Sequence, residues 1–362
     1  MEMMYVEDCC EILDSMRVPI TASDREEGEY PYYGANGIQD YVADYIFDDE
    51  LVLLAEDGGN FGSKERPIAY RVSGKCWVNN HAHVLKPKVG LNVDYLCYSL
   101  MFYKVDGMIN GATRQKLTQA AMCKMRIPLR TLEEQSHIVD ELNRIVKIKK
   151  LRQLELEILD NLIQARFVEM FGDPKLNDKG WNAGIISDYY EVKGGKRIPK
   201  GMGYADDTTA HPYLRATDMK NETILDDDIH YIDEEVYEHI KRYTVKSGDI
   251  YLTNVGVNLG MAGVIPEKYD GANLTENAVK LVPKTEKVID GVFFAHYINS
   301  PGIQDYINER KMSVGVPKLA IFRIETMPLL LPPMDIQMQF IEFHKQVNKL
   351  KLATSSQTTL AA

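Results

Sequence analysis

Polar residues that could contact a nucleic acid recur at matching places in the two halves of this 362-residue sequence. The loop 58–62 in the first half matches the loop 256–260 in the second half. Each loop holds one asparagine, Asn60 or Asn258, between glycines. Because glycine has no side chain, it lets the backbone approach a ligand closely. These two loops are therefore candidates for binding.

Two further pairs of polar segments follow the same correspondence. Residues 79–81 match 275–277, and residues 111–116 match 313–318. Their Asn, Gln, Arg and Lys side chains are the types that hydrogen-bond to base edges and hold phosphates. Any one of them alone is more often a solvated loop residue. Their recurrence at equivalent positions, with different identities in the two halves, is typical of two readers of different sequences on one scaffold.

We therefore predict a set of DNA-contacting residues from these loops and from the basic residues near them. The set is Asn60, Lys64, Asn80, His81, Arg114, Gln115, Lys116, Lys196, Arg197, Arg215, Asn254, Asn258, Asn277 and Lys318. The candidates for reading bases are Arg114, Gln115, Arg215 and Asn258. The candidates for holding phosphate are Lys116 and Lys318.

Motifs for catalysis are missing from the sequence. It contains neither the Asn-Pro-Pro-Tyr loop of amino-methyltransferases nor a phosphate-binding G-x-x-x-x-G-K-[ST] loop. The glycine-rich segments 194–196 and 201–203 lack a strand-turn-helix setting, so we interpret them as loops. His81 and His83 could in principle hold a metal ion, but alternating residues of a strand point to opposite faces. We predict no catalytic residue, no metal ligand and no cofactor in this chain.

The elements that must position these residues are also repeated. Residues 6–12 correspond to 186–192, and residues 132–135 correspond to 334–337. The period is far longer than the roughly 20–50 residues of solenoid repeats, so it indicates a duplicated domain. Short apolar runs broken by Gly and Asn turns predict strands in each copy, and 93–103 has the spacing of a helix.

A long helix follows the first domain. Thr131 and Glu134 form a predicted capping box, and neither Pro nor Gly occurs from there to Phe171. Apolar residues recur every three or four positions, which is typical of a coiled coil and predicts a length on the order of 60 Å. The predicted helix interface consists of Ile138, Leu142, Ile145, Leu151, Leu154, Ile158 and Leu162 on this helix, with Phe340 and Val347 on a second, shorter helix. The unpaired part of the long helix could support self-association.

These patterns predict an α+β fold with two tandem β-rich α/β domains, each followed by a helix, and the two helices pair as an antiparallel coiled-coil spacer. The predicted boundaries are 1–130 and 174–331 for the domains, 131–173 for the long helix, 332–352 for the short helix and 353–362 for a polar tail.

Composition limits the possible partners and compartments. The formal net charge of -11 lowers the expectation that the chain binds DNA alone, and it suggests that a partner supplies part of the positive field. No apolar stretch approaches the ~18–20 residues that would cross a bilayer, so we expect no membrane association. The five cysteines form no C-x-x-C pair and fit a reducing cytoplasm.

The chain resembles the specificity subunit of type I restriction-modification systems over nearly its whole length. The resemblance is carried by the two Pro-rich leads into helices, 127–139 and 329–337, by the helix end 167–174, and by Gly248-Asp249-Ile250-Tyr251-Leu252. It implies two target-recognition domains, each reading one half of a bipartite double-stranded DNA site, with the helices as a ruler between them.

The same resemblance implies the partners. Two methyltransferase subunits would bind the helices, and a restriction subunit would join that complex. The chain itself would not be a catalyst, since adenine methylation with S-adenosylmethionine would belong to the methyltransferase partner. The alternative is a coiled-coil scaffold that binds two protein partners through its polar loops without reading DNA.

Overall fold

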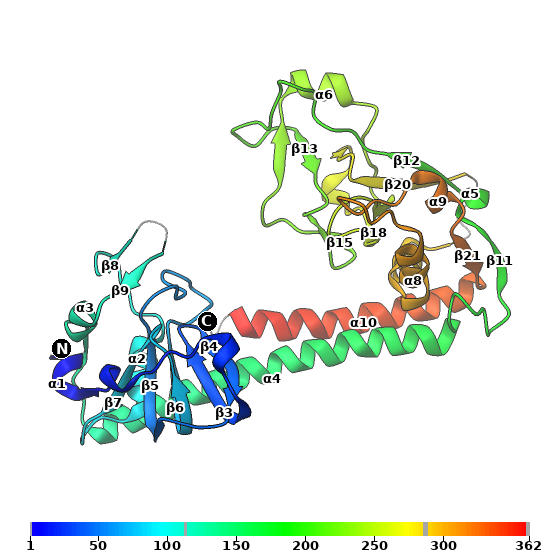
Figure 1. Ribbon diagram of the computed structural model, residues 1–362. Coiled ribbons are helices and arrows are strands. Elements are labelled where there is room, and N and C mark those ends of the chain that lie inside the picture. The colour runs from blue at the N-terminus through cyan, green and yellow to red at the C-terminus, as the bar shows by residue number, and fades with distance from the viewer. Residues whose placement is uncertain (1, 112–113, 285–288, 360–362) are drawn as a thin grey trace. The chain divides into compact units, whose positions relative to one another are not determined.

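The computed structural model describes residues 2–111, 114–284 and 289–359, which form two compact units (Figure 1). The first unit is Met1–Lys150 and the second is Leu151–Ala362. The helix α4 (Leu132–Phe171) belongs to both units, because the division falls within it. Strands and helices mix in each unit. Among the described residues, no helix has the length and apolar character needed to span a membrane.

The first unit is built on a six-stranded sheet in which β3 and β6 run parallel and the other neighbours run antiparallel. Its strand order is β2 (Cys10–Ile12), β7 (Ala82–Pro87), β5 (Phe47–Ala55), β6 (Ala69–Val78), β3 (Glu27–Gly34) and β4 (Gly37–Val42). The remaining elements are β1 (Met3–Tyr5), which pairs with β10 (Arg126–Pro128), the hairpin β8 (Ile109–Asn110) and β9 (Lys116–Leu117), and the helices α1 (Val6–Cys9), α2 (Val93–Met101) and α3 (Gln119–Cys123).

The second unit contains smaller sheets. They are β12 (Tyr190–Gly194), β20 (Ala278–Pro283), β17 (Ile250–Thr253) and β18 (Ala262–Val264); β16 (His230–Ile232), β13 (His211–Leu214) and β19 (Asn273–Leu274); the hairpin β14 (Met219–Lys220) and β15 (Thr223–Ile224); and the pair β11 (Asn182–Ile185) and β21 (Pro328–Leu331). Its helices after α4 are α5 (Ile186–Tyr189), α6 (Glu234–Ile240), α7 (Gly291–Asn299), α8 (Pro301–Arg310), α9 (Ile321–Glu325) and α10 (Met334–Thr359).

The duplication extends to single hydrogen bonds. The hydroxyl of Tyr95 donates to the Pro128 carbonyl at 3.0 Å, and that of Tyr297 donates to the Pro328 carbonyl at 2.9 Å. In both units a short strand at the start of the domain pairs antiparallel with the strand that leads into the following helix. Since these strand pairs join the start of each domain to its end, each copy closes on itself before its helix begins.

One buried glutamine in each copy ties the helix to the domain. The Gln135 Oε1 accepts from the Asn92 N–H at 2.7 Å, and the Gln337 Oε1 accepts from the Asp290 N–H at 2.9 Å. Both glutamines are fully buried. Asn92 and Asp290 are the N-caps of α2 and α7, so each glutamine holds the equivalent cap.

The capping box predicted at the start of α4 is present. The Thr131 N–H donates to Glu134 Oε2 at 2.9 Å, and the Glu134 N–H donates to Thr131 Oγ1 at 3.2 Å. The second helix is longer than predicted, because α10 continues past Leu352 to Thr359. Residues 360–362 of the predicted tail lie outside the described residues.

Within the second unit, α10 lies along the C-terminal part of α4 (Figure 1). The ring of Phe340 lies 5.3 Å from that of Phe167 and 5.7 Å from that of Phe171, and Lys351 Nζ lies 2.5 Å from Asp160 Oδ1. Phe340 and Val347, which the sequence predicts at the helix interface, are both buried in the core of this unit.

The middle of the predicted seam of α4, by contrast, remains about half exposed in this chain. Leu151, Leu154, Ile158 and Leu162 are between 45% and 56% exposed, and Ile145 is 46% exposed. The residues that do pack against the core of the second unit are Leu159, Ile163, Phe167, Met170 and Phe171. In the first unit, Ile138 packs partly against the core and Leu142 is half-buried.

The prediction that Leu151, Leu154, Ile158 and Leu162 lie at a helix interface therefore stays a prediction, because they belong to the part of the long seam that is unpaired within this chain. The helix α4 has two apolar faces, and both follow a spacing of three and four residues. The periodicity alone does not say which face an intrachain neighbour covers. We refer to Leu151, Leu154, Ile158 and Leu162 below as the exposed stripe.

Candidate nucleic-acid interface

Three loops meet at one end of β5 in the first unit. The Glu56 N–H donates to the His81 carbonyl at 2.9 Å, and the Leu117 N–H donates to the Glu56 carbonyl at 2.7 Å. The Gly58 N–H donates to the Gln115 carbonyl at 3.2 Å. The loop after β5, the turn before β7 and the segment before β9 are thus fixed to one another by backbone bonds.

The second unit repeats this frame at the end of β17. The Asn254 N–H donates to the Asn277 carbonyl at 2.9 Å, the Leu319 N–H donates to the Asn254 carbonyl at 2.8 Å, and the Gly256 N–H donates to the Pro317 carbonyl at 2.9 Å. The three loop correspondences predicted from the sequence are confirmed, because equivalent residues make equivalent bonds.

Charged side chains occupy the frame of the first unit. Asp57 Oδ1 lies 2.7 Å from both His81 Nδ1 and an Arg114 guanidinium nitrogen, and Lys116 Nζ lies 2.9 Å from Glu56 Oε1. The side chain of Arg114 is nevertheless 58% exposed, and that of Lys116 is 49% exposed. Both cations are therefore oriented by a carboxylate and still accessible to a phosphate or a base.

A buried ion-pair network supports this edge. His83 Nδ1 lies 2.6 Å from Asp14 Oδ2, and an Arg17 nitrogen lies 2.5 Å from Glu56 Oε2. Burial of Asp14 opposes its ionisation, but the hydrogen bond and charge of His83 outweigh burial and lower the pKa of that carboxyl group. Burial of Glu56 is likewise outweighed by Arg17 and Lys116, which lower its pKa.

This network was not predicted from the sequence, although Arg17 belongs to a repeated Arg-x-Pro segment that could have indicated it. His81 and His83 bind separate carboxylates, as the alternation of the strand predicts. His83 also places its Nε2 2.9 Å from the Leu117 carbonyl, so both of its ring nitrogens are engaged by protein groups.

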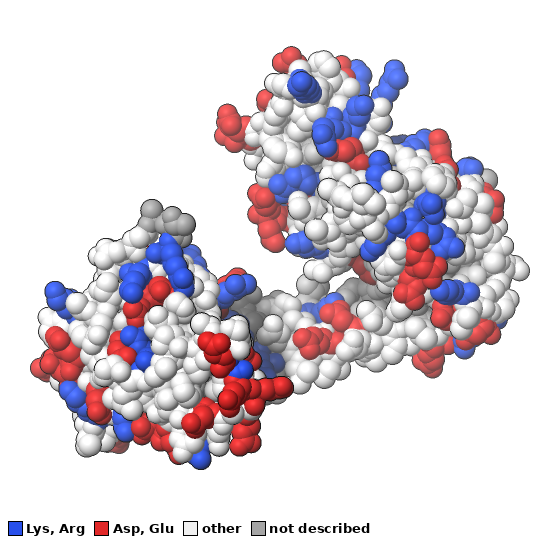
Figure 2. All heavy atoms as spheres, viewed as in Figure 1, with Lys and Arg blue, Asp and Glu red and all other residues white. Residues whose placement is uncertain are grey.

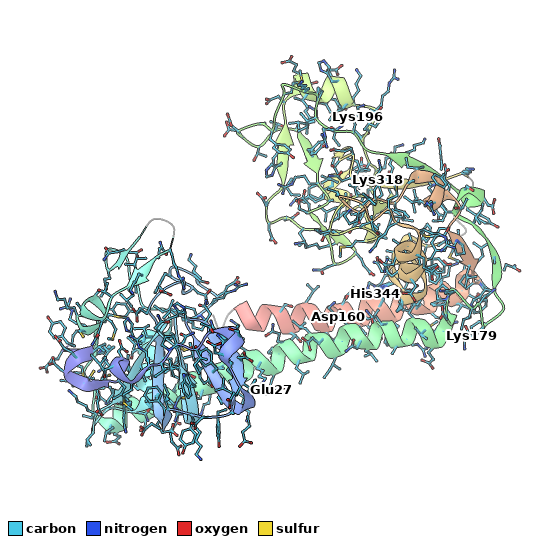
Figure 3. The ribbon with its side chains drawn as sticks, viewed as in Figure 1. Glu27, Asp160, Lys179, Lys196, Lys318 and His344 are labelled. Atoms are coloured by element: carbon cyan, nitrogen blue, oxygen red, sulfur yellow. The ribbon has the colours of Figure 1, made fainter. Side chains whose placement is uncertain are left out.

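In the second unit, Lys196 and Lys318 are exposed, and both are labelled in Figure 3. The Lys196 carbonyl accepts from the Tyr213 hydroxyl at 2.9 Å, and its ammonium lies 5.8 Å from the ring centre of Tyr243. Arg197 Nε donates to Glu276 Oε1 at 2.6 Å, yet its side chain is 79% exposed. Lysine and arginine together could hold a phosphate.

Arg215 is placed differently from its prediction as a base reader. Its guanidinium contacts Asp218 at 2.7 Å and Asp228 at 3.0 Å, and its side chain is only 21% exposed. The hydrogen bonds from these two carboxylates raise the pKa of Arg215 further above its ordinary value. The group therefore joins the two ends of the segment between β13 and β16, which includes the hairpin of β14 and β15.

The prediction that the Asn254 side chain contacts DNA is contradicted by its burial. Only 5% of the residue is exposed, and its Nδ2 donates to the Leu319 carbonyl at 3.4 Å. Asn258 is half-buried and donates to the Ala216 carbonyl at 3.4 Å, and Asn60 donates to the Pro67 carbonyl at 3.5 Å. A position between glycines in a loop does not distinguish an asparagine that faces solvent from one that closes the loop.

The other predicted residues lie on the surface or at its edge. Lys64, Asn80 and Gln115 are exposed, and Asn277 is half-buried next to Glu276. Figure 2 shows Lys and Arg gathered over the part of the first unit where β8 and β9 lie, and others gathered on the second unit where Figure 3 labels Lys196. Each unit thus has a basic area despite the acidic net charge of the chain.

The sequence matches the family model of the type I restriction modification DNA specificity domain over residues 1–159 and again over 178–361. A protein of Haemophilus influenzae described as a type I restriction enzyme specificity subunit is 28% identical over 332 residues, which cover 87% of this chain and 83% of that protein. The specificity subunit of the EcoprrI type I restriction enzyme of Escherichia coli is 24% identical over 115 residues, covering 32% of this chain and 27% of that protein.

Solved structures share the fold at low sequence identity. A chain from a study of complex assembly and conformational transition of the type I restriction-modification system aligns with a TM-score of 0.60 and 13% identity, covering 99% of this chain and 94% of that chain. The specificity subunit of the type I system of M. genitalium aligns with a TM-score of 0.55 and 12% identity, covering 99% and 92%.

Proposed function

Since this chain belongs to the type I restriction modification DNA specificity family, we propose that it selects the DNA sequence on which a type I restriction-modification complex acts. Each unit reads one half of a bipartite site in double-stranded DNA. The chain is not the catalyst in this proposal, and adenine methylation with S-adenosylmethionine is carried out by a methyltransferase partner in the cytoplasm.

The observation that carries the proposal is a common frame with different side chains. Glu56 and Asn254 make the same backbone bonds, as do His81 and Asn277. The accessible side chains beside this frame differ: Arg114 and Gln115 are exposed in the first unit, and Pro317 takes the place of Gln115 in the second. Since the major groove presents a distinct donor and acceptor pattern for each base pair, one frame with two sets of side chains suits the reading of two different half-sites.

The helices provide the binding surface for the other subunits. We propose that α10 and α4 act as an antiparallel coiled-coil spacer and that the exposed stripe of α4 binds a methyltransferase subunit. Four apolar side chains at about half exposure on one helix face are the kind of surface that marks a protein-protein contact. The stripe continues at Leu162 into a groove lined by Ala165, Arg166, Glu169 and Phe343.

Two copies of the methyltransferase subunit, together with the restriction subunit, complete the proposed complex. The acidic net charge of -11 supports a division of labour in which the partners supply much of the attraction to phosphate. The basic areas of this chain then position the two units on the duplex, and their loops select the bases.

The experiment is to map methylated bases in cells that carry the chain together with a type I methyltransferase subunit, and in cells with that methyltransferase subunit but without the chain. We expect methylation of one motif with two specified halves and an unspecified spacer, and its loss without the chain. A single continuous motif would contradict the two-reader proposal. Formation of the complex with no change in methylation would instead favour a scaffold that does not read DNA.

A further inference from the structure

Three polar residues from distant parts of the sequence meet in the second unit. Glu222 lies in the turn between β14 and β15, His296 lies on α7, and His344 lies on α10. One ligand atom from each, a carboxylate oxygen or a ring nitrogen, lies within 4.8 Å of the others. They line a cavity of about 860 Å³ whose wall also includes Asp160 and Asn348.

We propose that Glu222, His296 and His344 form a site for one divalent transition-metal ion, with Zn²⁺ as the best fit. Two imidazoles and one carboxylate are a common set of three protein ligands for zinc, which leaves a fourth position open. This inference goes beyond DNA reading and does not depend on it. Metal binding here would join the second domain, through α7 and the β14–β15 turn, to the helix α10.

The spacing of the ligand atoms agrees with a shared ion. His296 Nε2 lies 3.0 Å from Glu222 Oε2. Two ligands about 2.0–2.1 Å from one ion at a tetrahedral angle would stand roughly 3.3 Å apart. His296 Nε2 is buried and has no hydrogen-bond partner of acceptable direction among the described residues, so its contact with Glu222 is close but does not satisfy it.

Second contacts orient the ligands. Asn299 Nδ2 donates to Glu222 Oε1 at 3.0 Å, which leaves Oε2 on the side of His296. The rings of His296 and His344 are 4.6 Å apart at 77°. The Asn348 amide lies 2.9 Å from His344 Nε2 and acts as an outer partner only when its oxygen accepts from Nε2–H, with the ion on the other ring nitrogen. Such outer partners fix the orientation of metal ligands.

The three groups also influence one another's ionisation in the metal-free chain. Burial and the neighbouring His296 lower the pKa of His344 to about 4, so its ring is neutral at neutral pH. Burial of Glu222 is outweighed by His296 and Asn299, and its pKa lies below the ordinary value. The nearby ammonium of Lys351 opposes a cation, but it is paired with Asp160 at 2.5 Å.

The backbone holds Glu222 in an unusual conformation. Asn221 and Glu222 have φ values of 52° and 60°, as expected for a two-residue turn that prefers glycine at its second position. A Cβ atom on Gly263 would lie 2.4 Å from the carbonyl carbon of Glu222, so the turn is packed directly on β18. Glycine would adopt the backbone conformation of Glu222 with less strain. The turn nevertheless has a glutamate at this position, and its carboxylate lies beside the histidines.

A second cluster, formed by Asp14, Glu56 and His83, shows why geometry alone does not define a metal site. Its ligand atoms also lie within 4.8 Å of one another. However, both nitrogens of His83 are engaged, and Arg17 and Lys116 pair with Glu56. The positive side chains of Arg17 and Lys116 are therefore already paired with a carboxylate of that cluster.

The test uses the full chain after treatment with a chelator and dialysis. Zn²⁺ is titrated by calorimetry, and Co²⁺ is titrated while the visible absorption of a four- or five-coordinate ion is followed. We expect one ion per chain, with Glu222→Gln and His344→Gln each weakening binding at least 10-fold, which is the lower bound for loss of an outer partner. His239→Gln, an exposed histidine on α6, is the matched control and should bind as the natural chain does.

A second measurement guards against variants that fold poorly. The rise in melting temperature on adding Zn²⁺ should occur in the natural chain and in His239→Gln, and should be absent in the two ligand variants. Binding equal in all four proteins would overturn the site, as would no uptake by the natural chain. Strong near-ultraviolet absorption from a cobalt–thiolate bond would assign the ion to the cysteines and would also overturn it.

Discussion

At the scale of single residues, folding shifts the pKa of several ionisable groups, and His344 is the clearest example. Its pKa is lowered to about 4 by burial and by His296, whereas an unfolded histidine has a pKa of about 6.5. Between these values the unfolded chain takes up a proton that the folded chain does not. Stability is therefore lost as the pH falls from about 6.5 to about 4.

We predict that His344→Gln removes this loss. For one proton the slope is at most about 1.4 kcal/mol per pH unit. The free energy of unfolding should be measured by urea titration at several pH values, with chelator present. The difference between the natural chain and the variant should change across this window and level off below about pH 4. A constant difference would show that His344 is protonated alike in both states.

The paired glutamines give a second prediction at this scale. Gln135→Leu and Gln337→Leu each leave the N–H of a helix N-cap without its buried acceptor, which costs about 1–3 kcal/mol. Both variants should shift the urea midpoint downward. Gln153→Leu, at an exposed position of α4, is the control and should leave it unchanged. If Gln135→Leu and Gln337→Leu are as stable as the control, the glutamines are not anchors.

At the scale of elements, α4 has an inner and an outer apolar face. Ile163 is 4% exposed and Phe167 is 3% exposed, whereas Leu151 is 54% exposed and Leu154 is 50% exposed. Burial of the inner face already joins α4 to the core of the second unit. The outer face therefore remains available for another chain.

We predict that replacing both Leu151 and Leu154 with Asp separates stability from assembly. Because both are exposed, the free energy of unfolding should change by less than about 0.5 kcal/mol for each. Co-purification with the methyltransferase subunit should be lost. Ile163→Asp is the matched control on the inner face, and it should destabilise the chain strongly because it buries a charge without a partner. Normal recovery of the complex with the double variant would remove the stripe from the interface.

The long helix and the loop equivalences were predicted correctly from the sequence, whereas the buried face of the helix was not. The capping box at Thr131, the long helix and the loop equivalences follow from local chemistry and from duplication, which one sequence contains. The inner face of α4 could not be predicted, since both faces have helical spacing. The contacts of Asn254 depend on a segment 65 residues away. The Glu222–His296–His344 cluster joins three elements whose approach only tertiary packing determines.

At the scale of the whole molecule, the two units have a common frame and different surfaces, and this arrangement makes recognition separable. Gln115 is exposed in the first unit, and Asn277 lies at the equivalent edge of the second. Lys318 is exposed beside the second frame. Residues that read bases should affect one half-site, whereas residues that hold phosphate should affect all sequences alike.

The prediction is that Gln115→Ala relaxes one half of the methylated motif and Asn277→Ala relaxes the other. A good bidentate contact is worth roughly 1–3 kcal/mol of discrimination, so each change should broaden one position without abolishing methylation. Lys318→Ala should leave the motif unchanged, weaken binding of the assembled complex, and reduce the slope of log affinity against log salt by about 1. Methylation mapping and binding at several salt concentrations measure these effects. Each frame is closed by its own backbone bonds, so a change in one unit should affect only the half-site that this unit reads. If a change in one unit alters both halves of the motif, the two units do not read separately.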